Sequence, residues 1–152
     1  MTSRQEFYEQ RAPHRVREGG RFYHRLLNRL FTFVVPPGQR VLEVGCGLGD
    51  TLAAVKPARG VGIDFSGAVL ELARQRHPGL EFIHSSAENF SSGEEFDYII
   101  LSDLVNDLSD VQLLLDRLRA VSHPRTRIVV NFFNNLWRPI LGAAEKLGWK
   151  AP

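Results

Sequence analysis

The chain has 152 residues, of which 43% are hydrophobic and 24% are charged, which is the composition of an ordinary globular domain with a sizeable core. No stretch reaches the roughly 18 apolar residues of a membrane helix, and a single cysteine excludes an internal disulfide, so we expect a cytoplasmic protein without a membrane span. The formal net charge is +2, yet residues 1–40 hold eight arginines and three glutamates. These arginines are mixed with aromatic residues at helical spacing. They are interpreted as a solvated helix face, and nucleic acid is not an expected partner.

The first part of the chain is predicted to be helical. Residues 3–17 form one helical segment, which a proline interrupts, and an apolar stripe from Phe22 to Val34 predicts a second helix. The Pro-Pro-Gly sequence at 36–38 ends that helix and leads into the first strand.

From residue 40 onward, short apolar runs alternate with amphipathic segments. Strands are predicted at 40–45, 60–64, 80–84, 97–102 and 126–133, and helices at 49–55, 66–76, 110–121 and 136–147. Ser66 and Asp110 are suitable N-caps, and Pro124 is expected in a connection. The alternation predicts an α/β fold with a parallel sheet of about five strands and helices on both faces. In such sheets ligands bind at the carboxyl ends of the strands.

The most informative run is residues 41–50, Val-Leu-Glu-Val-Gly-Cys-Gly-Leu-Gly-Asp, in which a strand ends in glycines at alternate positions. Gly45, Gly47 and Gly49 allow the backbone to turn sharply and to approach a ligand closely. A dinucleotide fingerprint, G-x-G-x-x-G, would place its third glycine where Asp50 stands. The spacing therefore disfavours a nucleotide-dependent oxidoreductase.

A second short strand ends in Asp64, 19 residues after Gly45. A carboxylate at this point can accept hydrogen bonds from both hydroxyls of a ribose, as any adenosine cofactor requires. Cys46 is interpreted as a small residue that the turn accommodates and not as a nucleophile.

The pattern E-x-G-x-G-x-G followed by a strand and Asp64 resembles the first motifs of the class I S-adenosylmethionine-dependent methyltransferases, and the resemblance covers roughly residues 20–135. It implies a Rossmann-like doubly wound sheet. It also implies S-adenosylmethionine as cofactor, S-adenosylhomocysteine as product, and direct displacement at the sulfonium methyl. The expected acceptor is a small molecule or a glycan-related compound. The alternative is a non-catalytic S-adenosylmethionine-binding module.

The resemblance also implies which residues contact the cofactor. Glu43 would interact with the amino group of the methionine part, Asp64 with the ribose, and the backbone of the glycine turn would pass close to the ligand. Serine replaces the family's acidic residue at position 86, so its hydroxyl would take over the adenine contact, with the backbone of the next residue. The full set is Glu43, Gly45, Cys46, Gly47, Gly49, Asp64, Phe65, Ser86, Ala87, Ser102 and Asp103.

Catalytic residues are not identified by the sequence. Displacement at a sulfonium methyl needs alignment more than a strong base. If a proton must be removed, Asp103, Asp107, His24 and Tyr23 are alternatives among which the sequence does not choose. No His/Cys cluster has metal-ligand spacing, so no metal is expected.

Residues 1–152 are expected to form a single domain, with a helical cover at 1–38, the cofactor-binding core at 39–133 and a C-terminal helix at 134–152. Five strands are two fewer than the family fold has, so its last hairpin is expected to be missing. The 126–133 strand would then expose an edge. We expect self-association through that edge or through an aromatic surface near Trp137 and Trp149.

Overall fold

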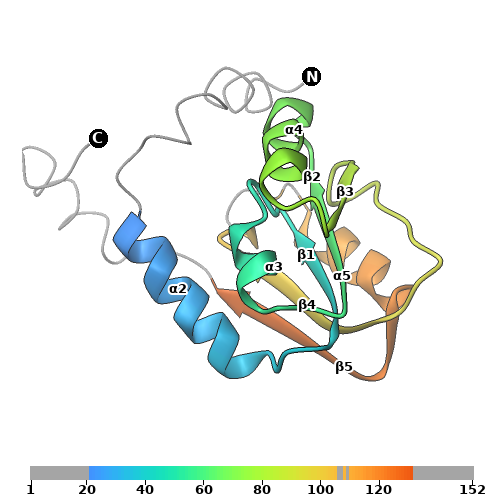
Figure 1. Cartoon of the computed structure of the whole chain (residues 1–152). Coiled ribbons are helices and arrows are strands. Elements are labelled where there is room, and N and C mark those ends of the chain that lie inside the picture. Colours follow the sequence, from blue (N-terminus) through green and yellow to red (C-terminus); the bar gives the residue numbers. More distant parts are fainter. Residues whose placement is uncertain (1–20, 106–107, 109, 132–152) are drawn as a thin grey trace, which may run out of the picture.

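The computed structural model describes residues 21–105, 108 and 110–131 (Figure 1). Its centre is a sheet of five parallel strands in the order β3-β2-β1-β4-β5. The strands are β1 (Arg40–Val44), β2 (Arg59–Asp64), β3 (Glu81–His84), β4 (Phe96–Ser102) and β5 (Ser122–Asn131). The described helices are α2 (Arg21–Val34), α3 (Asp50–Ala54), α4 (Gly67–Arg76) and α5 (Val111–Arg119). The predicted α/β fold with a parallel sheet is confirmed.

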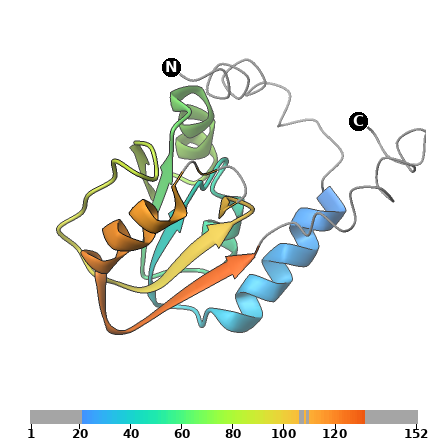
Figure 2. The same ribbon diagram turned by 180° about the vertical axis from the view of Figure 1, so that it is seen from behind.

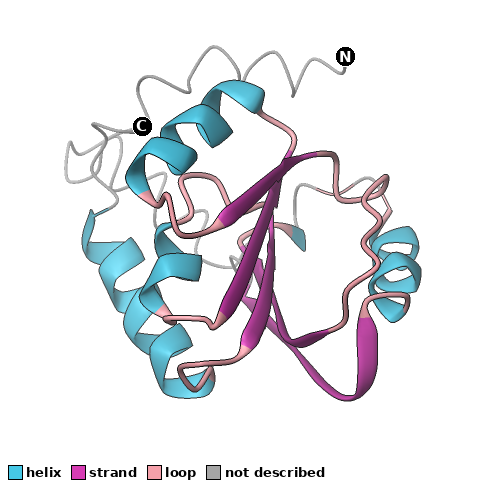
Figure 3. Ribbon diagram, turned by 45° about the vertical axis from the view of Figure 1, so that its right-hand side comes forward, coloured by secondary structure: helices cyan, strands magenta, loops and turns pink. Residues whose placement is uncertain are grey.

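Helices cover both faces of the sheet, as Figure 3 shows with the strands near the centre. On one face, Leu42 and Ile99 pack in a core that α5 closes through Leu114. On the other face, α2 and α3 pack over β1 and β4, and α4 packs against β2 and β3. The alternation of buried side chains along β1 and β4 supplies both cores, as expected for a sheet that is covered on both sides.

The strand order reverses at β1, because the chain moves outward through β2 and β3 and then returns to place β4 on the other side of β1. Ligands in open α/β sheets bind at this reversal, outside the carboxyl ends of the strands. The first glycine turn, the end of β2 and the end of β4 all lie there.

The predicted N-caps are confirmed. The hydroxyl of Ser66 accepts from the backbone N–H of Val69 at 3.4 Å, and the carboxylate of Asp110 accepts from the N–H of Leu113 at 2.9 Å. These acceptors satisfy backbone donors that have no partner within the helix.

The apolar stripes predicted for α2 and α5 are buried along a narrower seam than expected. Leu27 and Phe31 of α2 and Leu114 and Leu118 of α5 are buried. The flanking members of the two stripes are partly exposed, namely Tyr23, Leu26, Leu30, Val34, Val111 and Leu115. Each helix therefore meets the sheet along one line of contact.

The start of β5 differs from the prediction. The strand begins at Ser122 and not at 126, so Pro124 lies within it and not in a connection. β5 is the last strand in the sheet order (Figure 2), and proline is tolerated in edge strands and at bulges because a ladder donor is not needed there.

An irregularity accommodates the extra residues of β5. Phe96 pairs with Ser122, but Tyr98 pairs with Arg127, so several residues of β5 lie opposite one residue of β4. The Thr126 hydroxyl closes this bulge by donating to the carbonyl of Phe96 at 2.6 Å.

Several predictions lie outside the described residues: the helical segment at 3–17, the end of the strand at 132–133, the helix at 136–147 and the aromatic surface near Trp137 and Trp149. Among the residues that are described, no helix is both long and apolar enough to cross a membrane.

Candidate functional site

The glycine turn after β1 is held against the end of β2. The N–H groups of Gly45 and Cys46 both donate to the carbonyl of Ile63, at 2.7 and 2.9 Å. Gly45, Gly47 and Gly49 all have positive φ, at 74°, 52° and 74°. Three left-handed residues in five positions explain why the sequence repeats glycine at this spacing.

The surroundings of two of these glycines also leave little room for a side chain. A Cβ on Gly49 would lie 2.7 Å from the ring of Phe82, whereas a Cβ on Gly45 would lie 2.9 Å from Cδ1 of Leu104, the end of a flexible side chain. Gly49 is the N-cap residue of α3. A side chain at Gly49 would push the turn away from Phe82, and one at Gly45 would displace the end of the Leu104 side chain.

Asp64 fixes the turn to the carboxyl end of β2. Its side chain is 7% exposed, and its two oxygens accept from the N–H groups of Gly47 and Ser66, each at 2.9 Å. A carboxylate has about four lone-pair sites, so capacity for two further donors remains. Asp64 thus stands where a pair of ligand hydroxyls could be bound, next to the glycine backbone.

Glu43 is buried beneath the turn, with 2% of its surface exposed. Its carboxylate accepts from the N–H of Leu52 at 3.0 Å and so ties β1 to α3. Burial raises the pKa of Glu43 to about 8, and the nearby carboxylates of Asp50 and Asp64 act in the same direction. A cation at this site would favour the charged form.

Cys46 is buried, and burial followed by the charges of Glu43 and Asp64 raises the pKa of its thiol. Its sulfur packs against the backbone of Gly62, and a Cβ on Gly62 would lie only 2.7 Å from this sulfur. A thiol that is inaccessible and resists ionisation is a poor nucleophile. This geometry agrees with the interpretation of Cys46 as a small turn residue.

The loop after β3 lies beside Asp64, because the N–H of Ser85 donates to the Asp64 carbonyl at 3.1 Å. Ser86 follows in this loop and is half-buried, whereas Ala87 is buried in the core. Phe65 is half-buried, and its carbonyl contacts the ring of His84 at 2.8 Å. The structure therefore brings the three segments expected around an adenosine to one edge of the sheet.

At the end of β4, Asp103 is joined to two other elements. The hydroxyl of Tyr23, on α2, donates to both Asp103 oxygens at 3.0 and 3.1 Å, and the amide of Asn131, at the end of β5, donates at 2.8 Å. Asp103 has a φ of 51°, which is uncommon for a residue other than glycine. Burial and then the charge of Asp103 raise the pKa of Tyr23 to about 12.

Sequence reasoning treated Tyr23 and Asp103 as alternatives and missed that they are partners. It also missed Asn131, although a polar residue inside a predicted apolar strand at 126–133 was a signal. Asp107, another candidate base, lies outside the described residues. His24 is described and packs edge-on against the Tyr23 ring at 5.7 Å. Within the described ranges, no group of His, Cys, Asp and Glu residues could hold a metal ion.

The carboxyl ends of the strands thus bring together the glycine turn, the buried carboxylates of Glu43 and Asp64, and the Asp103 carboxylate with its two donors.

Similarity to known proteins agrees with this arrangement. A family model described as a methyltransferase domain matches residues 36–147. The phthiotriol/phenolphthiotriol dimycocerosates methyltransferase of Mycobacterium leprae is 39% identical over 90 residues, which cover 55% of this chain and 33% of that protein.

Two further similarities are weaker in identity but broader in coverage. The ubiquinone biosynthesis O-methyltransferase of Bradyrhizobium diazoefficiens is 28% identical over 123 residues, covering 74% of this chain and 48% of that protein. The solved structure of a DhpI–SAH complex has the same fold, with a TM-score of 0.69, 18% identity, and coverage of 83% of this chain and 65% of that one. The chain spans about half the length, or less, of the curated relatives it matches. With a family model matching most of its length, the chain belongs to the class I S-adenosylmethionine-dependent methyltransferase family.

Proposed function

We propose that this chain binds S-adenosylmethionine at the carboxyl ends of β1, β2 and β4 and transfers its methyl group to a small-molecule acceptor. The observation that carries the proposal is the Asp64 carboxylate, which is fixed by the N–H groups of Gly47 and Ser66 and keeps capacity for two donors. A ribose with two adjacent hydroxyls matches that capacity. The cofactor would supply a methyl group activated on a sulfonium sulfur.

The neighbouring residues fit the rest of this cofactor. Glu43 would oppose the ammonium group of the methionine part, a cation beside a carboxylate that burial otherwise keeps protonated. The glycine backbone from Gly45 to Gly49 would pass along the ligand. On the adenine side, Phe65 would pack against the ring, the Ser86 hydroxyl would hydrogen-bond it, and the Ala87 N–H would donate to it.

The acceptor side is assigned to Asp103, with Ser102 beside it. The Tyr23 hydroxyl donates a hydrogen bond to Asp103 and has a pKa of about 12. It therefore stays protonated and is a poor base at neutral pH. Asp103 is the acceptor in this cluster, and Tyr23 and Asn131 hold its orientation. When the acceptor takes the methyl group that S-adenosylmethionine would supply, its proton would pass to the Asp103 carboxylate, and S-adenosylhomocysteine would be released.

The acceptor is proposed to be a small molecule and not a nucleic acid. The two curated relatives described above are named as methyltransferases of phthiotriol-type compounds and of ubiquinone biosynthesis. A non-catalytic binding module is the second candidate. The matched region covers only 33% and 48% of the length of these two relatives, so this chain is compared with part of each enzyme.

We also propose that two copies associate through β5. This strand lies at the end of the sheet that the described residues form, and Ile128 and Val130 on it are 42% and 44% exposed. Unpaired strand edges with exposed apolar side chains readily recruit a second chain.

Calorimetry with S-adenosylmethionine, S-adenosylhomocysteine and NAD tests the cofactor. Binding of both sulfur compounds and not of NAD is expected, and a folded protein that binds neither sulfur compound would contradict the proposal. Asp64→Asn should weaken binding at least about tenfold, because a charged acceptor of ribose hydroxyls is lost. Asp116→Asn removes an equal charge from the exposed surface of α5 and should leave affinity unchanged.

Formation of S-adenosylhomocysteine in the presence of fractionated small molecules then separates an enzyme from a binding module. Turnover that depends on one fraction supports the enzyme. Tight cofactor binding without turnover in any fraction supports the module.

A further inference from the structure

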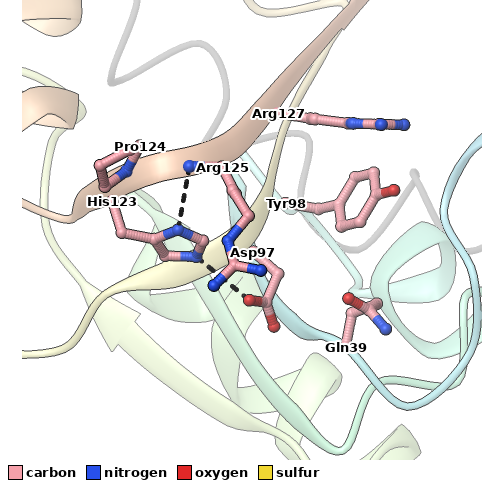
Figure 4. Close-up of a pocket in the computed structure, with 7 residues that line it drawn as sticks. All are labelled: Gln39, Asp97, Tyr98, His123, Pro124, Arg125 and Arg127. Atoms are coloured by element: carbon pink, nitrogen blue, oxygen red, sulfur yellow. Dashed lines mark hydrogen bonds and ion pairs between the residues drawn. The ribbon is translucent and has the colours of Figure 1, made fainter.

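A second polar hollow lies at the opposite end of the sheet from the glycine turn. It is an open concavity of about 860 Å³ at the amino ends of β4 and β5 and just before β1 (Figure 4). Its lining is Gln39, Asp97, Tyr98, His123, Pro124, Arg125 and Arg127. None of these residues belongs to the proposed cofactor site.

The positive charges of this hollow are not neutralised. Arg125 and Arg127 alternate along β5, are exposed, and form no ion pair with any residue that the structure describes. Five other arginines in the same part of the chain, Arg40, Arg59, Arg74, Arg76 and Arg119, do pair with carboxylates.

The one carboxylate in the lining is already engaged. Asp97 accepts from the N–H of Arg40 at 2.8 Å and from the His123 ring at 3.1 Å, and these bonds hold its pKa below the ordinary value. The other nitrogen of that ring accepts from the N–H of Arg125 at 3.2 Å. The ring proton is therefore on Nε2, facing Asp97. The hydrogen-bonded pair of Asp97 and His123 closes one side of the hollow and is called the Asp97–His123 wall below.

Tyr98 contributes a polar group that opens into the hollow. The residue as a whole is 7% exposed, and its hydroxyl makes no hydrogen bond with a described residue. Since no buried side-chain polar atom in the described structure lacks a partner, this hydroxyl is reached by solvent and is free to donate to a ligand in the hollow. Tyr98 and Arg127 are register partners on neighbouring strands, and Figure 4 shows both side chains extending in the same direction. An acceptor held by the guanidinium would also lie within reach of the phenol.

We propose that this hollow binds a small doubly charged anion, inorganic phosphate or the phosphate of a small monoester. Guanidinium groups match the geometry of phosphate oxygens, two of them balance two negative charges, and the Tyr98 hydroxyl and the Gln39 amide supply further donors. The hollow is local and ends at the Asp97–His123 wall, and the adjoining surface carries Glu94 and Glu95. That acidic border favours a compact anion over an extended acidic peptide.

The test is calorimetric titration of the full chain at pH 7.5 and fixed ionic strength with phosphate, phenyl phosphate and a polyglutamate peptide. Phosphate and phenyl phosphate should bind. The double variant Arg125→Gln/Arg127→Gln should lower their affinity at least about tenfold, because charge-assisted hydrogen bonds are lost. Tyr98→Phe keeps the packed ring, removes only the hydroxyl, and should lower affinity about threefold to tenfold.

Arg74→Gln/Arg76→Gln is the charge-matched control, since it likewise removes two positive charges, but from α4, which packs against β2 and β3. Circular dichroism verifies that each variant is folded. Free phosphate binding without phenyl phosphate binding assigns the site to the inorganic ion, and binding of both assigns it to phosphate groups in general. Absence of phosphate binding, an unchanged affinity in the double variant, or binding of polyglutamate alone would overturn the proposal.

Discussion

Replacing Glu43 by glutamine should remove a pH dependence of stability that the wild-type chain carries. Burial raises the pKa of Glu43 from 4.5 to about 8 in the folded protein, so the folded state holds a proton that the unfolded state has lost between these values. Stability is therefore full below pH 4.5 and falls as the pH rises toward 8. The shift corresponds to about 5 kcal/mol, a large part of the 5–15 kcal/mol that a domain typically has.

Other shifted groups leave this window clear. The pKa values of Glu94 and Asp97 lie below their ordinary 4.5 and 3.8, so their contribution is lost only on further acidification. Tyr23, with a pKa of about 12, contributes stability below its ordinary value of 10.0 and loses it only as the pH rises further. Between pH 5 and 8 the difference between wild type and Glu43→Gln thus isolates Glu43.

Urea unfolding followed by circular dichroism from pH 5 to 8, without cofactor, measures this difference. The glutamine can still accept from the N–H of Leu52, so the variant should match wild type near pH 5 and exceed it by several kcal/mol at pH 8. Glu71→Gln, on an exposed part of α4, should keep the wild-type slope. Parallel slopes for wild type and Glu43→Gln would refute the reasoning.

Three further outcomes are expected. Gly49→Ala should lower the free energy of unfolding by about 1–3 kcal/mol in thermal or urea unfolding, because it meets both a positive φ and the Phe82 ring; an unchanged stability would show that the turn relaxes without strain. Tyr23→Phe should reduce the rate of methyl transfer about tenfold and leave cofactor affinity near wild type, since only the orientation of Asp103 is affected; equal losses in both would place Tyr23 in cofactor binding. Ile128→Lys should abolish self-association measured by light scattering; a wild type that is monomeric at high concentration would remove that proposal.

The local motif made the cofactor end of the fold predictable. Glycine at 45, 47 and 49 indicates a turn with left-handed residues, and parallel pairing of β1 and β2 places the end of β2, with Asp64, beside that turn. The right-handed crossover rule predicts helices over the parallel strands, but the order β3-β2-β1-β4-β5 is known only from the structure. The contact roles of the individual residues toward the cofactor stay predictions.

The parts that sequence reasoning missed depend on long-range contacts. Tyr23 and Asp103 are 80 residues apart, and nothing local in either segment indicates that α2 crosses the end of β4. The early start of β5 depends on the bulge opposite Phe96. From sequence alone Pro124 indicates a connection, and only the structure shows that it lies in a bulged strand at the end of the described sheet. The unpaired state of Arg125 and Arg127 also depends on long-range contacts, because sequence alone does not show which arginines, such as Arg40 and Arg59, pair with carboxylates.

Two groups at the carboxyl ends of the strands are costly where they stand, the buried carboxylate of Glu43 without a countercharge and the left-handed backbone of Asp103. Well-folded sequences avoid such conflicts except where function requires them. An ammonium group beside Glu43 would offset the first cost, and the second holds the Asp103 carboxylate where Tyr23 and Asn131 donate to it. At the amino ends of the strands, Arg125 and Arg127 have no carboxylate partner among the described residues, and the Tyr98 hydroxyl opens into the same hollow. Because these features lie at opposite ends of one sheet, a single small ligand could not contact both, which argues for two separate binding surfaces.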